Sequence, residues 1–167
     1  LLVVASEKLD RSPEPKMGSV ALALCKKAIP CSVLIVKPHS TAPANARLGL
    51  SYVVGVNSSS LEMFDWLTDV ARRGQDKFYV ANCSGTSATS GMTSRPTNNG
   101  GNIVQIFKDK AVSRGFLPIG RILDGKVSVE LPKLTHAVKA DFTVVSASKS
   151  TGEVSKGTQE ILKDPLT

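Results

Sequence analysis

Two places in the sequence have the residues for binding an anion. In each, an apolar segment is followed by a polar loop and then by a glycine next to a hydroxyl residue, Gly18-Ser19 in the first and Gly157-Thr158 in the second. Where a strand leads through such a loop into a helix, the free N–H groups and the dipole of the first helical turn favour a negatively charged ligand. Both segments therefore predict contact with a phosphate or a similar anion.

The elements that would position the first loop can be identified from their composition. Residues 1–5 and 33–36 are unbroken apolar runs, which are typical of parallel strands buried on both faces. Residues 19–28 predict a helix between them, ending before Pro30. Residues 7–16 are polar and contain two prolines, so they predict a loop. The segment is thus expected to fold as strand, loop, helix and strand.

This arrangement resembles the last third of a universal stress protein domain. The family's phosphate loop runs Gly, two residues, Gly, nine residues, and then Gly-Ser or Gly-Thr. Here Ala5 and Lys8 occupy the first two glycine positions, and Gly18-Ser19 match the last pair. Lys8 would crowd a triphosphate lying against the backbone, although its ammonium group could also pair with a phosphate.

The resemblance implies an α/β fold of the adenine nucleotide alpha hydrolase-like type, which is a doubly wound parallel sheet with strand order 3-2-1-4-5. It also implies that ATP or another adenine nucleotide, with its associated Mg²⁺, binds in the crevice between strands one and four.

The opening of the chain recurs near its end. The pattern at residues 1–8 returns at 141–149, about one domain length later. In the later copy Ser146 and Lys149 stand at the positions of the family's two glycines, and Gly157-Thr158 replace the final pair. Tandem repeats are the simplest interpretation, and chance similarity between two valine-rich strands is the alternative.

The repeat divides the chain into three parts. Residues 1–38 are expected to be the C-terminal strand–helix–strand unit of one repeat, 39–49 a linker, and 50–167 a second domain that lacks its own last strand. A further alternative is that the N-terminal unit supplies this last strand, within one chain or by exchange between two.

The second domain opens with an apolar strand at 52–56. Asn57 follows at the position of the family's aspartate, which lies near the adenine and ribose, and Ser58 comes next. The resemblance implies that Asn57 keeps one polar contact there and loses the charge. Ser59 and Glu62 are expected to form a capping box. They would open a helix over 60–73 that buries one stripe of side chains: Met63, Phe64, Leu67, Val70 and Ala71, with Trp66 at the edge of the core.

The remaining chain alternates between strand and helix patterns. Strands are expected at 77–82, 116–123 and 141–145, and helices at 103–114, 128–139 and 158–163. Asn102 and Ser128 are the expected helix caps, with Pro132 in a first turn and Ile106 and Phe107 facing inward. Residues 127–131 also alternate like a strand, and 83–101 predict a long mobile loop. Alternating strands and helices predict a parallel sheet. The family's strand order, in which strands one and four are neighbours, implies that Asn57 and the loop at Ser146 meet at the carboxyl ends of these strands.

Composition excludes several classes of function. The net charge of +7 comes from dispersed residues without interleaved aromatics, so no nucleic-acid surface is expected, and no apolar run is long enough to cross a membrane. The cysteines, Cys25, Cys31 and Cys83, have no zinc spacing, and reduced thiols suit the cytoplasm. His39 and His136 form no metal or catalytic pattern, so we expect neither a metal site nor an enzyme. Residues 146–149 match S-x-x-K, but the partner motifs of that class are missing.

Two hypotheses for function remain open. The first is a nucleotide-binding protein of stress response or signalling. The second is a scaffold without nucleotide that acts through dimerisation or protein partners, because both copies of the loop lack the family's two glycines. In either case we expect a homodimer, with strand exchange between copies as one form of it.

Overall fold

The computed structural model describes residues 2–5, 23, 33–36, 48–84, 99–146, 158, 160 and 161. Most of the linker expected at 39–49 and of the loop expected at 83–101 lies outside these residues. So do the proposed site residues Lys8, Gly18, Ser19, Lys149 and Gly157. Of the helix expected over 19–28, only Ala23 is described, and it is helical.

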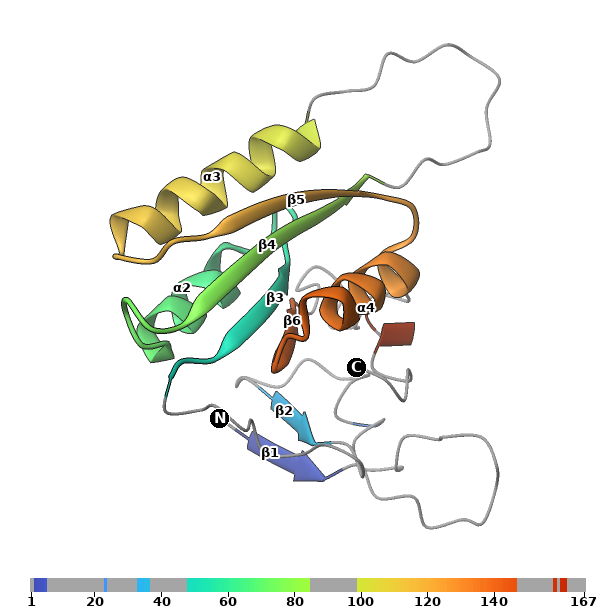
Figure 1. Cartoon of the computed structure of the whole chain (residues 1–167). Coiled ribbons are helices and arrows are strands. Elements are labelled where there is room, and N and C mark those ends of the chain that lie inside the picture. Colours follow the sequence, from blue (N-terminus) through green and yellow to red (C-terminus); the bar gives the residue numbers. More distant parts are fainter. Residues whose placement is uncertain are drawn as a thin grey trace.

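The centre of the molecule is a four-stranded parallel sheet with the order β5-β4-β3-β6 (Figure 1). Its strands are β3 (Ser51–Gly55), β4 (Lys77–Ser84), β5 (Ile119–Asp124) and β6 (Phe142–Val145). Counted from β3, this order is 3-2-1-4. The predicted doubly wound α/β fold is therefore confirmed for these four strands, and β3 lies between β4 and β6 as strand one should.

A second sheet contains the two strands expected at the start of the chain. β1 (Leu2–Ala5) and β2 (Val33–Val36) pair in parallel, with Leu2 opposite Val33 and Ala5 opposite Val36. Within the described residues, these strands are hydrogen-bonded to each other and not to the four-stranded sheet. Strand exchange between copies stays a prediction.

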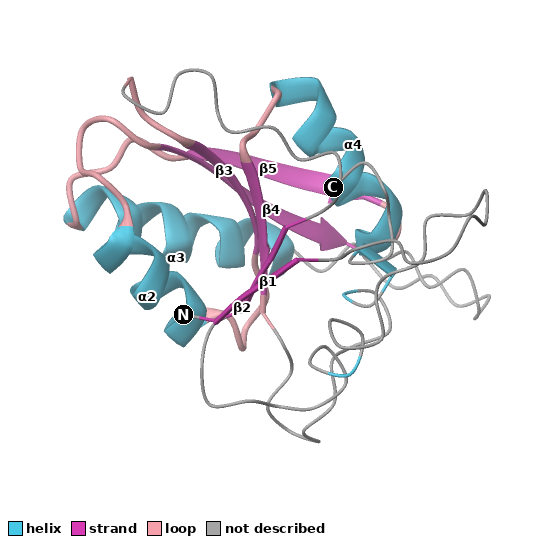
Figure 2. Ribbon diagram, turned by 90° about the horizontal axis from the view of Figure 1, so that it is seen from below, coloured by secondary structure: helices cyan, strands magenta, loops and turns pink. Residues whose placement is uncertain are grey.

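Helices cover both faces of the four-stranded sheet. α2 (Leu61–Val70) and α3 (Asn99–Ser113) lie on one face, and α4 (Val127–Val138) lies on the other (Figure 2). Consecutive strand residues point to opposite faces, so Val54 packs in the core under α2 and α3, whereas Val53 packs in the core under α4. This double burial explains why the central strand β3 is apolar from Tyr52 onward and does not alternate with polar residues.

Phenylalanines fill the core beneath α2 and α3. Phe78 on β4 lies between Phe64 of α2 and Phe116, at ring-centroid distances of 6.1 Å and 4.7 Å, and Phe64 meets Phe107 of α3 edge-on at 5.0 Å. The expected inward positions of Phe64, Leu67 and Phe107 are confirmed. Those of Val70 and Ile106 are wrong, because these side chains are 55% and 56% exposed.

The helix starts differ from those expected. Ser60, and not Ser59, is the N-cap residue of α2, so the predicted capping box is wrong. α3 starts at Asn99, before the expected cap Asn102, and α4 follows Lys126, so Ser128 lies inside its first turn.

Three further expectations about α4 and β5 are corrected. Pro132 lies in the second turn of α4 and is buried, and the alternative of a strand over 127–131 is wrong because these residues are helical. β5 starts at Ile119 and not at Phe116, whose side chain fills the core instead. Trp66 is partly buried against that core, as expected for its edge.

Candidate functional site

A pocket of about 150 Å³ lies at the carboxyl ends of β3, β4 and β6. This is the edge of the sheet at which ligands bind in open α/β folds. Its lining comes from all three strand ends, the start of α4 and the helical residue at 158: Gly55, Val56, Asn57, Ala81, Asn82, Cys83, Val127, Val145, Ser146 and Thr158. The parallel topology thus brings together residues that are about 100 positions apart in the sequence.

Asn57 lies just beyond the end of β3, and its side-chain oxygen is already occupied. Oδ1 accepts hydrogen bonds from Ser59 N at 2.9 Å, from Ser59 Oγ at 2.7 Å and from Ser60 Oγ at 2.9 Å. These three donors identify the oxygen of the amide and leave its NH₂ group facing outward. Toward a ligand, Asn57 can therefore act only as a hydrogen-bond donor.

Ser60 connects Asn57 to the end of β6. It is fully buried, and its Oγ accepts a hydrogen bond from Asn57 N at 3.0 Å while donating to Asn57 Oδ1. The same oxygen lies 3.1 Å from Ser146 Oγ. Because the single proton of Ser60 goes to Asn57, Ser146 is the donor in this contact. The lone pairs of Ser146 then remain available to accept from a ligand in the pocket.

Asn82 fixes the wall of the pocket between β3 and β4. Its Nδ2 donates to Val56 O at 2.7 Å, and Val56 N donates to Ala81 O at 2.8 Å. A Cβ atom at Gly100 would lie 2.8 Å from Asn82 Oδ1, so the first turn of α3 can approach this side chain only through a glycine. Asn82 is 9% exposed, and it ties the ends of β3 and β4 together beneath the first turn of α3.

Cys83 lies in the same wall, in a poorly solvated position. Burial, and to a smaller extent the nearby Glu130 carboxylate, raise the pKa of its thiol to about 11. The thiol is therefore protonated at neutral pH and is a poor nucleophile.

Of the expected site residues that the structure describes, three come together here and two do not. Asn57, Ser146 and Thr158 line the pocket, and Thr158 is buried. Ser58 is exposed and is not part of the lining, and Ala5 is the last residue of β1.

Sequence reasoning missed Ser60, Asn82 and Cys83. An asparagine directly after the apolar run of β4 was a usable signal for Asn82, because polar residues at strand ends face the ligand edge of the sheet. The contact between Ser60 and Ser146 had no signal in the sequence.

The size and polarity of the pocket limit what it can hold. Ligand sites commonly measure roughly 300–1,000 Å³, so the described pocket fits a group the size of a nucleobase, and phosphates would lie outside it. None of the ten lining residues is charged. The pocket is thus compatible with a neutral ring that accepts from Asn57 and donates to Ser146, and its described part offers no cation for a phosphate.

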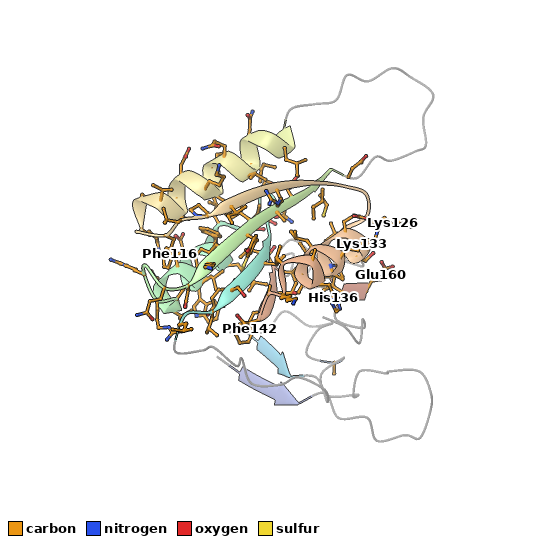
Figure 3. The ribbon with its side chains drawn as sticks, viewed as in Figure 1. Phe116, Lys126, Lys133, His136, Phe142 and Glu160 are labelled. Carbon is orange, nitrogen blue, oxygen red and sulfur yellow. The ribbon has the colours of Figure 1, made fainter. Side chains whose placement is uncertain are left out.

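None of the charged side chains on or beside α4 is part of this lining, although Glu130 of α4 lies close enough to Cys83 to raise the pKa of its thiol. His136 is exposed on α4, and Lys126, Lys133 and Glu160 are on the same side of the molecule (Figure 3). Within the described residues there is no group of three or more His, Cys, Asp or Glu side chains that could hold a metal ion. No helix in this part of the chain is long and apolar enough to span a membrane.

Comparison with known proteins identifies the fold. No protein-family model and no curated protein matches the chain. Among solved structures, a universal stress protein from Archaeoglobus fulgidus superposes with a TM-score of 0.56 at 14% identity, over 68% of this chain and 90% of that one. The protein Rv1636 from Mycobacterium tuberculosis H37Rv gives a TM-score of 0.47 at 20% identity, over 62% and 77% of the two chains. The fold is therefore that of a universal stress protein.

Proposed function

We propose that this chain, which has the universal stress protein fold, works as a universal stress protein-like protein in stress response or signalling. Its proposed ligand is ATP or another adenine nucleotide, bound with its Mg²⁺ in the crevice between β3 and β6. The observation that carries the proposal is the convergence of Asn57, Ser146 and Thr158 on one pocket at the carboxyl ends of the strands. In this fold that edge is where a ligand can meet residues from several strands at once.

The hydrogen-bond pattern suggests how the nucleoside part would be held. The free NH₂ of Asn57 would donate to a ring nitrogen or a ribose oxygen, and Ser146 Oγ would accept from an amino or hydroxyl group. An adenine nucleoside offers both kinds of atom. The apolar side chains of Val56, Val127 and Val145 would contact the faces of the ring.

The phosphates would be bound by the loop that precedes Gly157-Thr158, or by its counterpart before Gly18-Ser19. Support comes from Thr158, which is helical and buried at the pocket, because the first turn of a helix presents N–H groups to an anion. Lys149 and Lys8 are the cations that we assign to the phosphates in the two copies.

Titration of adenosine, AMP, ADP and ATP with Mg²⁺ into the whole chain tests this proposal. We expect saturable heat and a rise in melting temperature, with about 2.7 kcal/mol of stabilisation when the ligand is at 100 times its Kd. Gly157→Val, Gly18→Val and Ser146→Val should weaken binding. Ser113→Val, at an exposed serine on α3, is the matched control and should bind as the unmodified chain does.

A second function is favoured by one feature of the sequence. Ala5 and Lys8 in one copy, and Ser146 and Lys149 in the other, replace the two glycines that bring a triphosphate against the backbone. In this alternative the chain binds no nucleotide and acts as a scaffold through dimerisation or protein partners. The absence of any shift with millimolar ATP would favour it over the first function.

Assembly and location form part of the same proposal. We infer a homodimer in the cytoplasm, with strand exchange between copies as one possible form of it. Two edge strands in the described sheet, β5 and β6, are free to extend it across a dimer interface.

A further inference from the structure

The free edge of β5 is exposed and apolar. In the described part of the chain β5 pairs with β4 alone, so its other side presents a row of N–H and C=O groups. Large apolar side chains on or beside this edge are exposed: Leu117 by 86%, Ile122 by 59% and Ile119 by 39%. Exposed apolar side chains next to free backbone groups are typical of a surface to which an extended segment of another chain is added.

The side chains of β5 alternate between the two faces of the sheet. A Cβ atom at Gly120 would meet Val104 and Lys108 of α3, so Gly120 faces α3. Ile122 shares this face, because it is two residues further along the strand. Ile119 and Arg121 therefore point to the opposite face, on which α4 lies.

One flank of α3 extends this surface beyond β5. The helix packs on β4 and β5 (Figure 1). Lys110 and Arg114 lie about 120° and 80° around α3 from the buried Val104, on the side where they pair with an aspartate of α2. Lys108 and Val112 lie about 40° and 80° from Val104 on the other side, and Val112 is 57% exposed. This flank is turned toward the free edge of β5, so a strand added to that edge would lie beneath it.

Two cations border the free edge, on opposite faces of the sheet. Lys108 lies over Gly120, with its Cδ atom 2.8 Å from the position of a Gly120 Cβ. Arg121 is exposed, and its Nη1 donates to the backbone oxygen of Gly120 at 3.3 Å. The ion pairs found in the described residues involve neither cation. Asp124, the acidic residue of β5, lies at the far end of the strand.

We propose that the free edge of β5, together with this flank of α3, binds an extended segment of another protein in which two adjacent acidic residues are flanked by apolar residues. The acidic pair lies opposite Gly120 and Arg121. Adjacent residues of a strand point to opposite faces, so one carboxylate meets Lys108 and the other meets Arg121. The apolar residues then lie opposite Ile119 and Ile122. This pattern is the same in both directions of the chain, so it fits either a parallel or an antiparallel added strand.

The charges of the edge favour this partner over a purely apolar strand or a second copy of β5. Gly120 has no side chain, which leaves room for a carboxylate beneath Lys108. Arg121 opposes indiscriminate pairing with apolar strands, because its charge needs a partner in the added strand. A second copy of β5 offers Asp124 alone and no adjacent acidic pair.

This binding edge is separate from the pocket. None of the residues that line the pocket belongs to β5, so the inference is independent of nucleotide binding. It also leaves β6 as the edge available to the homodimer proposed above.

Fluorescence anisotropy with a labelled synthetic peptide tests the proposal. In the peptide, two adjacent glutamates are flanked by valines and threonines, and the whole chain is added up to about 1 mM, which covers weak complexes. We expect saturable binding. It should be lost when the peptide amides that face β5 are N-methylated, because this removes the backbone donors and keeps the side chains. A peptide with lysines in place of the glutamates should bind about tenfold more weakly.

Variants of the chain locate the site. Ile122→Lys should weaken binding of the glutamate peptide by about tenfold. Ile106→Lys is the matched control: Ile106 has a similar exposure, 56%, but lies about 200° around α3 from the buried Val104, away from the edge. Lys108→Glu combined with Arg121→Glu should reverse the preference, so that the lysine peptide binds about tenfold more tightly than the glutamate peptide.

Several results would overturn the proposal. Absence of binding at the highest concentration would do so, as would binding that survives N-methylation or is unaffected by Ile122→Lys. A preference for glutamate that persists in the double variant would show that the two cations do not select the partner. Sedimentation velocity of the chain without peptide tests the other occupant. Ile122→Lys should leave the oligomeric state unchanged, and a dimer that this variant dissociates would assign the edge to a second copy instead.

Discussion

At the amino ends of the strands, two carboxylates tie β3 to its neighbours, whereas at the carboxyl ends the same strands are tied by neutral groups. Asp76, before β4, accepts from Leu50 N at 2.8 Å, and Asp141, before β6, accepts from Ser51 N at 2.7 Å. At the other end, Ser60 and Ser146 perform the equivalent connection between β3 and β6 through hydroxyl groups.

This difference shows which end is free to bind an anion. Carboxylates hold backbone N–H groups more firmly than hydroxyls do, and they make the amino end a rigid anchor. The same negative charges at the carboxyl end would repel a phosphate. Because its described lining is neutral, the pocket keeps its strands together without that repulsion. The following predictions test this contrast.

Removing the buried carboxylate should have the largest effect on stability. Asp76 has a side chain that is 1% exposed, and it accepts from Leu50 N, Arg72 N and the Arg72 guanidinium. Asp76→Ala removes the carboxylate that accepts from two backbone N–H groups, which should lower the unfolding free energy by about 3 kcal/mol. Urea denaturation measures this. Asp141→Ala, at an exposed position, should lower the unfolding free energy by less. Equal losses of stability in the two variants would contradict the stronger role that we assign to Asp76.

At the carboxyl end, Cys83 should react slowly with alkylating reagents. A pKa raised from 9.0 to about 11 leaves roughly 100-fold less thiolate at pH 8 than an ordinary cysteine has. The folded state then binds the proton more tightly, so this contribution to stability is complete below pH 9 and is lost as the pH rises toward 11. Peptide-resolved mass spectrometry after iodoacetamide treatment measures the rate. Alkylation of Cys83 as fast as in the unfolded chain would contradict its burial in the pocket wall.

Ser60→Ala should affect stability and binding together. The change leaves Asn57 N without its acceptor and releases Ser146, so we expect a loss of about 2 kcal/mol. Ligand affinity should fall as well, since both pocket residues lose their support. Ser60→Thr, which keeps the hydroxyl, is the control. If Ser60→Ala destabilised the chain but bound adenosine with unchanged affinity, Ser60 would not position the site.

The smallest change in stability, and a gain in binding, is expected for Asn57→Asp. One carboxylate oxygen would keep the contacts to Ser59 and Ser60, and the other would accept from a ribose hydroxyl where the amide can only donate. We expect adenosine to bind about tenfold more tightly, as a charged acceptor strengthens a hydrogen bond. Calorimetry with adenosine avoids the opposing effect of phosphate charge. Weaker adenosine binding would show that the ligand presents an acceptor to residue 57.

Much of the fold was predictable because a strand that is buried on both faces has a continuous apolar sequence, which can be recognised without the tertiary structure. The runs at 1–5, 33–36 and 52–56 have no charged or strongly polar residue, and each contains a strand of a parallel pair. Gly74 and Gly115 come after α2 and α3, and both have a positive φ angle. Glycine tolerates this left-handed conformation better than other residues do.

The helix boundaries were less predictable because a polar side chain near the start of a helix can form hydrogen bonds with several different partners. Ser59 has the residue type and spacing of a cap, yet its N–H and hydroxyl are both taken by Asn57 Oδ1, and the helix starts one residue later. Likewise, Ile106 and Val70 lie beside the buried stripe of their helices. Both side chains are more than half exposed, and only the packing of each helix on the sheet, which the sequence does not contain, decides this.

The sequence by itself determined that the strands are parallel, and its resemblance to a known family implied that Asn57 and Ser146 follow neighbouring strands. Periodicity and burial act locally, and the strand–helix alternation leaves few topologies. Only the tertiary structure decided what those residues can do. Ser146 donates its hydroxyl proton to Ser60, and Asn57 Oδ1 accepts from Ser59 and Ser60. The pocket therefore presents one donor, the NH₂ group of Asn57, and one acceptor, the hydroxyl oxygen of Ser146. Which donors and acceptors of a side chain remain free depends on its neighbours in space. The neighbours of Asn57 and Ser146 are fixed only when β3 and β6 pair.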